Sequence, residues 1–138
     1  MRKRSSFAMA VVAILAFAVP GLAQSHASHA PAAPFQPVSA LVDLPDFIPG
    51  MGSLYVDPAT LPAGPFLAYD REGLLVSSIY MIPLAAMNEQ RSFDGLAVGD
   101  GEVDHVDIQF NAGHPGVAEP HYHVVLWYVS PAEAAGLQ

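Results

Sequence analysis

The fold is set by the run His105-Val-Asp-Ile-Gln-Phe-Asn111 and, nine residues later, by His121-Tyr-His-Val-Val-Leu-Trp-Tyr-Val129. Both runs alternate with period two, which is the pattern of half-buried β-strands. The connecting residues 112–120 contain two Gly and two Pro, so we predict a turn and two antiparallel strands. Four of the six histidines of the chain lie between positions 105 and 123, so any site chemistry should be found at this hairpin.

The spacing of these histidines favours a metal site. His121 and His123 are two residues apart and therefore lie on the same side of a strand, where one ion can bind both imidazoles. We expect His105 or Asp107 to complete the ligand set from the neighbouring strand, and His114 can fold in from the connecting loop. Two or three histidines with a carboxylate suit a divalent transition metal: zinc, copper, iron or manganese.

The strand register decides whether these groups meet, and the sequence allows two registers. In the first, Asn111 pairs with His121, which puts His105 opposite Trp127 and too far from His121 to share an ion. In the second, slipped register, Asp107 lies opposite His121 and all four groups gather. A nine-residue loop does not fix the register as a two-residue turn does, so both stay open.

Two other interpretations of the histidine-rich face need no metal. The side chains can form a polar patch satisfied by hydrogen bonds, or an interface that responds to pH. A nucleophilic enzyme is not indicated, because the chain has no Cys, no Gly-x-Ser-x-Gly motif and no phosphate-binding loop.

The N-terminus has the features of a signal peptide over residues 1–23. Arg2, Lys3 and Arg4 are basic, Phe7 to Val19 is apolar, and Gly21-Leu-Ala23 supplies small residues for cleavage. The apolar run is shorter than the roughly 20 residues that span a bilayer. We therefore expect a secreted or periplasmic protein whose mature chain begins near Gln24.

The charge of the mature chain excludes some partners. Removing the signal leaves two Arg against 13 Asp and Glu, a net charge of −11 with His neutral. We expect binding neither to nucleic acid nor, after cleavage, to a membrane. Because there is no Cys, the exported chain has no disulfides, and stability must come from its core, from association or from a ligand.

The remaining residues predict one small domain. Residues 24–40 are rich in Pro, Ala, Ser and His and are expected to be a flexible linker, and residues 41–138 to fold. A hairpin is predicted from Phe66–Tyr69 and Leu74–Ile82, the second strand apolar on both faces and therefore central in its sheet. We expect a mainly β fold: a small antiparallel sheet or partly open barrel.

One or two short helices complete the predicted fold, since the C-terminal segment can also be a frayed tail. Residues 84–91 are mostly helix formers and follow Pro83, a residue suited to a first helical position. Ser130, Pro131 and Glu133 have the spacing of a capping box at the start of a short C-terminal helix. With these, the fold class is a β-rich α+β domain.

Several short motifs resemble a known family, in the order Pro49-Gly-Met-Gly52, Val56-Asp-Pro58, Tyr80-Met-Ile-Pro83, His105-Val-Asp-Ile108, Gly113-His114 and Pro120-His-Tyr122. The chain is similar to a family of secreted bacterial proteins of unknown function, one member of which is controlled by an extracytoplasmic-function sigma factor and forms a homodecamer. The resemblance implies a small β-rich domain that homo-oligomerises. This sequence has Gln109 where the family has a His, and His123 where Asp is usual.

These observations lead to one functional hypothesis and two alternatives. We expect an exported, homo-oligomeric binding or envelope-stress protein, its ligand a small molecule or a divalent metal bound at the histidine-rich hairpin. The first alternative is a small cupin-like metal-dependent enzyme using His105, His121 and His123, because His-x-His on a strand begins cupin metal sites. The second is a structural assembly subunit.

Overall fold

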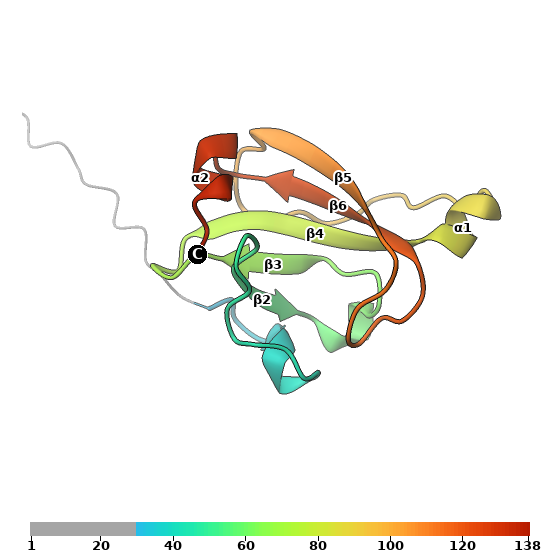
Figure 1. The fold of residues 1–138 in the computed structure, drawn as a ribbon, viewed down its shortest axis with the longest axis horizontal. Helices are drawn as coiled ribbons and strands as arrows, with labels where there is room; N and C mark the ends of the chain where they lie inside the picture. The colour runs from blue at the N-terminus through green and yellow to red at the C-terminus, as the bar shows by residue number, and fades with distance from the viewer. Residues whose placement is uncertain (1–29) are drawn as a thin grey trace, which may run out of the picture.

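The computed structural model describes residues 30–138, which form one open, six-stranded antiparallel sheet in the order β1-β2-β3-β4-β6-β5 (Figure 1). The predicted signal peptide, its cleavage site, His26 and His29 lie outside these residues. The elements are β1 (Gln36–Pro37), the 3-10 helix η1 (Val38–Ala40), β2 (Ser53–Val56), the 3-10 helix η2 (Pro58–Thr60), β3 (Phe66–Tyr69), β4 (Leu75–Pro83), α1 (Leu84–Asn88), β5 (His105–Asn111), β6 (His121–Trp127) and α2 (Pro131–Ala135). The predicted mainly β class is confirmed.

Strand β4 is the centre of the sheet, as its two apolar faces predict. It pairs with β3 on one side and β6 on the other, and its seven interior residues are buried. Ile79 and Met81 belong to the hydrophobic core on one face. On the other face, Ser78 accepts a hydrogen bond from Gly99 N at 2.9 Å, and the Tyr80 hydroxyl donates to Ala97 O. The segment between α1 and β5 therefore covers the second face.

Strand β6 buries the face that carries its histidines. His121, His123, Val125 and Trp127 are all buried, whereas the three residues between them are only partly buried. Val125 and Trp127 belong to the hydrophobic core, and period-two alternation puts the histidines on the same side. The imidazoles thus lie inside the protein.

The outer face of the hairpin has the opposite character. Val106, Ile108 and Phe110 of β5 are 51%, 68% and 57% exposed. β5 is also the last strand of the sheet, so one of its backbone edges is unpaired in the described chain. The molecule therefore presents an apolar strand at its edge.

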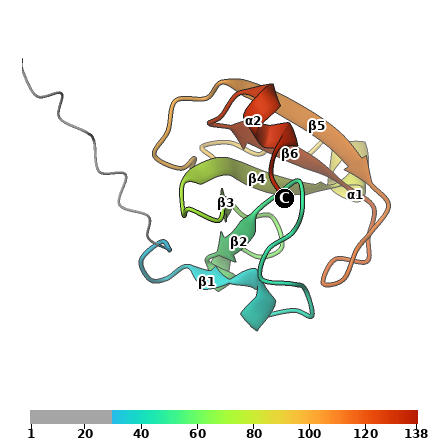
Figure 2. The same ribbon diagram turned by 60° about the vertical axis from the view of Figure 1, so that its left-hand side comes forward.

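The folded part begins before the predicted end of the linker at residue 40. Gln36 and Pro37 pair with Val56 and Tyr55 of β2, and Val38 packs in the core with 8% exposure (Figure 2). A Pro-rich composition suggested a linker, but a β-branched residue and two edge-strand pairings tie this segment to the sheet. The linker prediction is wrong for residues 36–40.

The two helices are short. α1 ends at Asn88, three residues before its predicted end, because Gln90 adopts a left-handed φ of 57°. α2 has the predicted capping box: Ser130 Oγ accepts from Glu133 N, and the Glu133 carboxylate accepts from Ser130 N. Within residues 30–138, neither helix is long and apolar enough to cross a membrane.

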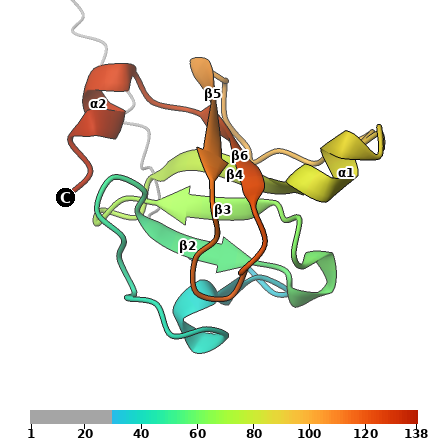
Figure 3. The same cartoon turned by 45° about the vertical axis from the view of Figure 1, so that its right-hand side comes forward.

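The loop between β5 and β6 folds back over the core face of the sheet. Figure 3 shows it crossing in front of β2 and reaching toward the N-terminal segment. Val117 packs against the core, and a Cβ on Gly116 would lie 3.0 Å from Val42 Cγ1. Loop residues 112–120 and N-terminal residues 38–51 therefore approach each other across the sheet.

Gly52 provides a test of this packing, with Gly50 as a matched control. Both have positive φ, but a Cβ at Gly52 would lie 2.5 Å from Tyr69 O, whereas a Cβ at Gly50 meets nothing within 4 Å. We expect Gly50→Ala to lower the free energy of unfolding by about 1–2 kcal/mol through backbone strain. Gly52→Ala should lower the free energy of unfolding by roughly 1–3 kcal/mol more than Gly50→Ala, because its Cβ overpacks against β3. Urea denaturation measures both values. Equal losses in the two variants would contradict the close approach of Gly52 to β3.

Candidate metal centre

Three histidines converge inside the protein at one end of the β5–β6 hairpin. His121 and His123 point inward from β6, and His114 comes from the loop that precedes it. The ring centroids of His121 and His123 are 4.8 Å apart, and the His114 ring lies 4.9 Å and 5.5 Å from them. One nitrogen from each of the three rings lies within 4.8 Å of the other two.

The loop holds His114 in place by a local backbone bridge. His114 N donates to Val117 O at 2.9 Å, and Val117 N donates back to His114 O at 3.0 Å. Gly113 precedes the bridge with a φ of 126°, and its Cα lies so close to Ala118 that a Cβ would be 2.4 Å from Ala118 O. The Gly and Pro content that predicted a turn thus builds a compact structure that presents an imidazole.

Backbone carbonyls fix the orientation of two of the rings. His121 Nδ1 lies 2.7 Å from Glu119 O, and His114 Nδ1 lies 3.0 Å from Pro115 O. A carbonyl oxygen only accepts, so Nδ1 is the donor in each ring, and in the neutral form of that tautomer the lone pair is on Nε2. Metal-binding histidines in proteins typically have such a second hydrogen bond, which fixes both the tautomer and the ring direction.

The His123 ring is held by a hydrogen bond to the His121 ring. His121 Nε2 and His123 Nε2 are 3.0 Å apart, and because His121 Nε2 is unprotonated, His123 donates this hydrogen bond. Zn–N distances of about 2.0–2.1 Å place neighbouring ligand nitrogens of a tetrahedral site roughly 3.3 Å apart. With the His123 proton on Nδ1 instead of Nε2, the ring stays neutral, and an ion could lie between the two Nε2 atoms with little movement of these two side chains.

The His123 imidazole is held in its neutral form. Burial, reinforced by the neighbouring His121 and His114, lowers the pKa of His123 from 6.5 to about 4. Desolvation disfavours the imidazolium, and nearby imidazolium charges would repel it further. Since only a neutral imidazole binds a metal, protons compete little for His123 at neutral pH.

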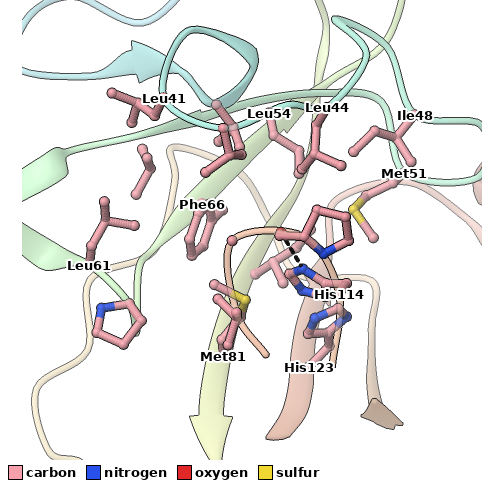
Figure 4. A pocket seen from close by; sticks show the side chains of 18 of the residues that line it. Leu41, Leu44, Ile48, Met51, Leu54, Leu61, Phe66, Met81, His114 and His123 are labelled. Atoms are coloured by element: carbon pink, nitrogen blue, oxygen red, sulfur yellow. Dashed lines mark hydrogen bonds between the residues drawn. The ribbon is translucent and has the colours of Figure 1, made fainter. Parts of the chain in front are cut away.

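A cavity of about 350 Å³ borders the cluster, and Figure 4 shows His114 and His123 at one end of it. The N-terminal segment, β2, β3, β4 and the β5–β6 loop form its walls. Only three of its lining side chains are polar: Asn111, His114 and His123. The others are Val38, Leu41, Val42, Leu44, Ile48, Met51, Leu54, Val56, Leu61, Pro62, Phe66, Ile79, Met81, Pro115, Gly116 and Val117.

His105 and Asp107 do not reach this cluster. The hairpin has the first of the two possible registers, in which His105 lies opposite Trp127 and Asp107 opposite Val125. Trp127 is six residues from His121 along β6. At about 3.4 Å per residue, His105, which lies opposite Trp127, is therefore roughly 20 Å from His121. The prediction that His105 or Asp107 completes a site with His121 and His123 is wrong in this register.

Both side chains have local partners instead. Trp127 Nε1 donates to Asp107 Oδ2 at 2.9 Å, and His105 stacks on the Trp127 ring at 5.9 Å. His105 Nδ1 also lies 2.9 Å from Asp104 Oδ1. Asp107 and His105 therefore secure the tryptophan at the far end of the hairpin from the histidine cluster.

The cavity was not foreseen from the sequence. Six of its lining residues lie within residues 38–51, of which 38–40 were predicted as linker and 41–51 as the start of the domain. The apolar residues Leu41, Val42, Leu44 and Ile48 in that segment were the available signal. Four apolar side chains in a turn-rich stretch are expected to pack against other apolar residues, and here they line this cavity.

Comparison with known proteins gives a relative of known structure. No family model matches the sequence, and no curated protein matches it. The chain is similar to the hypothetical protein TTHB210 from Thermus thermophilus, whose crystal structure has been solved. The two are 48% identical over 68% of this chain and 86% of that one, with a TM-score of 0.61.

The lowered pKa of His123 predicts how acid acts on the metal-free protein. Between about pH 6.5 and 4 the unfolded chain binds a proton at this position that the folded chain does not. The free energy of unfolding should therefore fall by up to about 3 kcal/mol as the pH drops through this range. Urea denaturation with a chelator present measures this loss.

Two variants isolate the contribution of His123 to that loss. His123→Gln should remove most of this part of the pH dependence, whereas His105→Gln, at the far end of the hairpin, should keep it. The same acid-induced loss in the wild type and in His123→Gln would show that His123 is not the responsible group.

Proposed function

This chain belongs to the family of the hypothetical protein TTHB210, and within that family we propose that it is an exported protein that binds one divalent transition-metal ion through His114, His121 and His123. The observation that carries the proposal is the convergence of the three imidazoles, two of which have Nδ1 on a backbone carbonyl, so that Nε2 is the nitrogen directed toward the other rings. Export is supported by the basic start and apolar run of the N-terminal sequence.

The ligand set favours particular metals. Three neutral imidazoles suit zinc, copper and iron better than magnesium or calcium, which prefer oxygen ligands. The cluster contains no carboxylate among the described residues, so manganese is a weaker candidate than the sequence suggested. Zinc is the first metal to test because it accepts the tetrahedral geometry that a three-histidine site with one further ligand provides.

A three-histidine site leaves one coordination position open. A binding protein can fill it with its ligand, and a metal-dependent enzyme can fill it with water or substrate. We propose the binding function and keep a cupin-like enzyme as the alternative, with His114 in the place that the sequence suggested for His105.

We further propose that the protein self-associates through the apolar face of β5. Val106, Ile108 and Phe110 are more than half exposed on an edge strand, next to the partly buried Tyr122 of β6. Exposed apolar strands at sheet edges are the surfaces through which chains pair. A structural assembly role would use the same surface without the metal.

Zinc titration of the metal-free protein tests the metal site. Because His26 and His29 offer two further imidazoles outside the candidate site, the background for all variants is the full chain with both changed to Asn. We expect calorimetry to show one zinc per chain, and the double variant His121→Ala, His123→Ala to weaken binding at least about a hundredfold. Zinc at a hundred times its dissociation constant should add about 2.7 kcal/mol to the free energy of unfolding.

The control is His105→Ala, which removes a histidine from the same hairpin but far from the cluster. It should bind zinc as the background protein does. The site is refuted if zinc binds no tighter than about a millimolar, or if the double variant binds as well as the background protein.

Light scattering tests self-association. We expect the wild type at tens of micromolar to have a mass above that of one chain, and Ile108→Lys to lower it, because a lysine cannot be buried unpaired at an apolar contact. Gln109→Lys adds the same charge to the opposite face of β5 and should keep the wild-type mass. A monomeric wild type would exclude this proposal.

A further inference from the structure

The cavity beside the histidine cluster has the character of a small-molecule site. Its volume of about 350 Å³ lies near the lower end of the roughly 300–1,000 Å³ of such sites. Its walls are apolar apart from Asn111, His114 and His123, and Figure 4 shows the two histidines at one end. A few polar groups at one end of an apolar cavity orient a ligand that has one polar head and one apolar body.

Two lining leucines at the other end of the cavity lie partly in solvent. Leu41 and Leu61 are 39% and 45% exposed, and Figure 4 shows both of them away from His114 and His123. A ligand can therefore place its head at the histidines and extend its body past Phe66 toward these leucines. The apolar part is limited in length by the volume of the cavity.

The charge of the bound metal ion favours a ligand with an anionic head group. An ion bound by three neutral imidazoles keeps its full positive charge, and this charge dominates the local field. The only other cations in residues 30–138 are Arg71 and Arg91, and neither lines the cavity. Arg71 lies over the Phe47 ring, and its Nε donates to Gln138 O. An anionic head in this apolar site can thus be neutralised only by the ion.

We propose that the cavity binds a medium-chain monocarboxylate, with its alkyl chain along the apolar walls and its carboxylate in the open coordination position of the ion on His114, His121 and His123. This inference rests on the proposed metal site. It predicts that carboxylate binding depends on the metal, because the desolvated anion is unfavourable beside neutral imidazoles.

Decanoate is the probe, and calorimetry on the zinc-loaded and metal-free full chain is the measurement. We expect decanoate to bind the zinc-loaded protein at least tenfold tighter than the metal-free protein. Each buried methylene adds about fourfold in affinity, so decanoate should also bind at least tenfold tighter than hexanoate. Decyltrimethylammonium has the same chain length but no metal-binding head, and it should not bind.

A cobalt-loaded sample tests the position of the head directly. The visible absorption of cobalt(II) depends on its ligand set, so decanoate should change the spectrum and decyltrimethylammonium should not. The matched variants are Leu61→Trp, at the exposed end of the cavity, and Leu96→Trp, of similar exposure but outside it. Leu61→Trp should weaken the affinity for decanoate at least tenfold and leave the affinity for zinc unchanged. Unchanged zinc affinity also shows that the Leu61→Trp protein folds. Leu96→Trp should change neither affinity.

The outcomes separate this inference from the metal site. If zinc does not bind, both proposals fail. If zinc binds but decanoate does not, only the inference fails. Equal decanoate affinity with and without zinc, or an unchanged cobalt spectrum, would overturn the placement of the carboxylate on the metal.

Discussion

The register between β5 and β6 is the constraint on which the rest of the site depends. Pairing Trp127 with His105 lets Trp127 and Val125 enter the core, and the period of two then turns His123 and His121 inward as well. A shift by one residue would put the histidines in solvent and the tryptophan outside. The hydrophobic core therefore excludes odd register shifts, and the burial of both imidazoles follows from that.

Burying imidazoles is unfavourable unless their nitrogens are satisfied, and the β5–β6 loop provides the partners. Glu119 O and Pro115 O each accept from one Nδ1, and the close passage of Gly113 past Ala118 makes the turn tight enough to bring His114 in. What remains is a set of nitrogens directed at one another. The shared His121–His123 hydrogen bond satisfies two of them without a metal, and an ion would satisfy all three.

The sequence predicted strands β3 to β6, the antiparallel hairpin, the central position of β4 and the capping of α2, because these depend on local periodicity and turn residues. It predicted the histidine hairpin as the place of any site, but it could not choose between His114 and His105 as the third member. That choice depends on the register and on the path of a nine-residue loop, neither of which local pattern fixes. The cavity was out of reach for a related reason: residues 38–51 become a wall only when the loop packs over them.

The hairpin also reverses the usual association of polar residues with the outside. The face that holds His121 and His123 is buried, and the face that holds Ile108 is in solvent. A sheet that turns its polar face toward an interior site must leave its apolar face uncovered or cover it with another chain. Both faces belong to β5 and β6. An ion bound at the buried face and a partner chain bound at the exposed face would therefore both stabilise the same hairpin. By linkage, any effect of metal binding on association equals the effect of association on metal affinity. One hairpin thus joins the candidate site to the candidate interface.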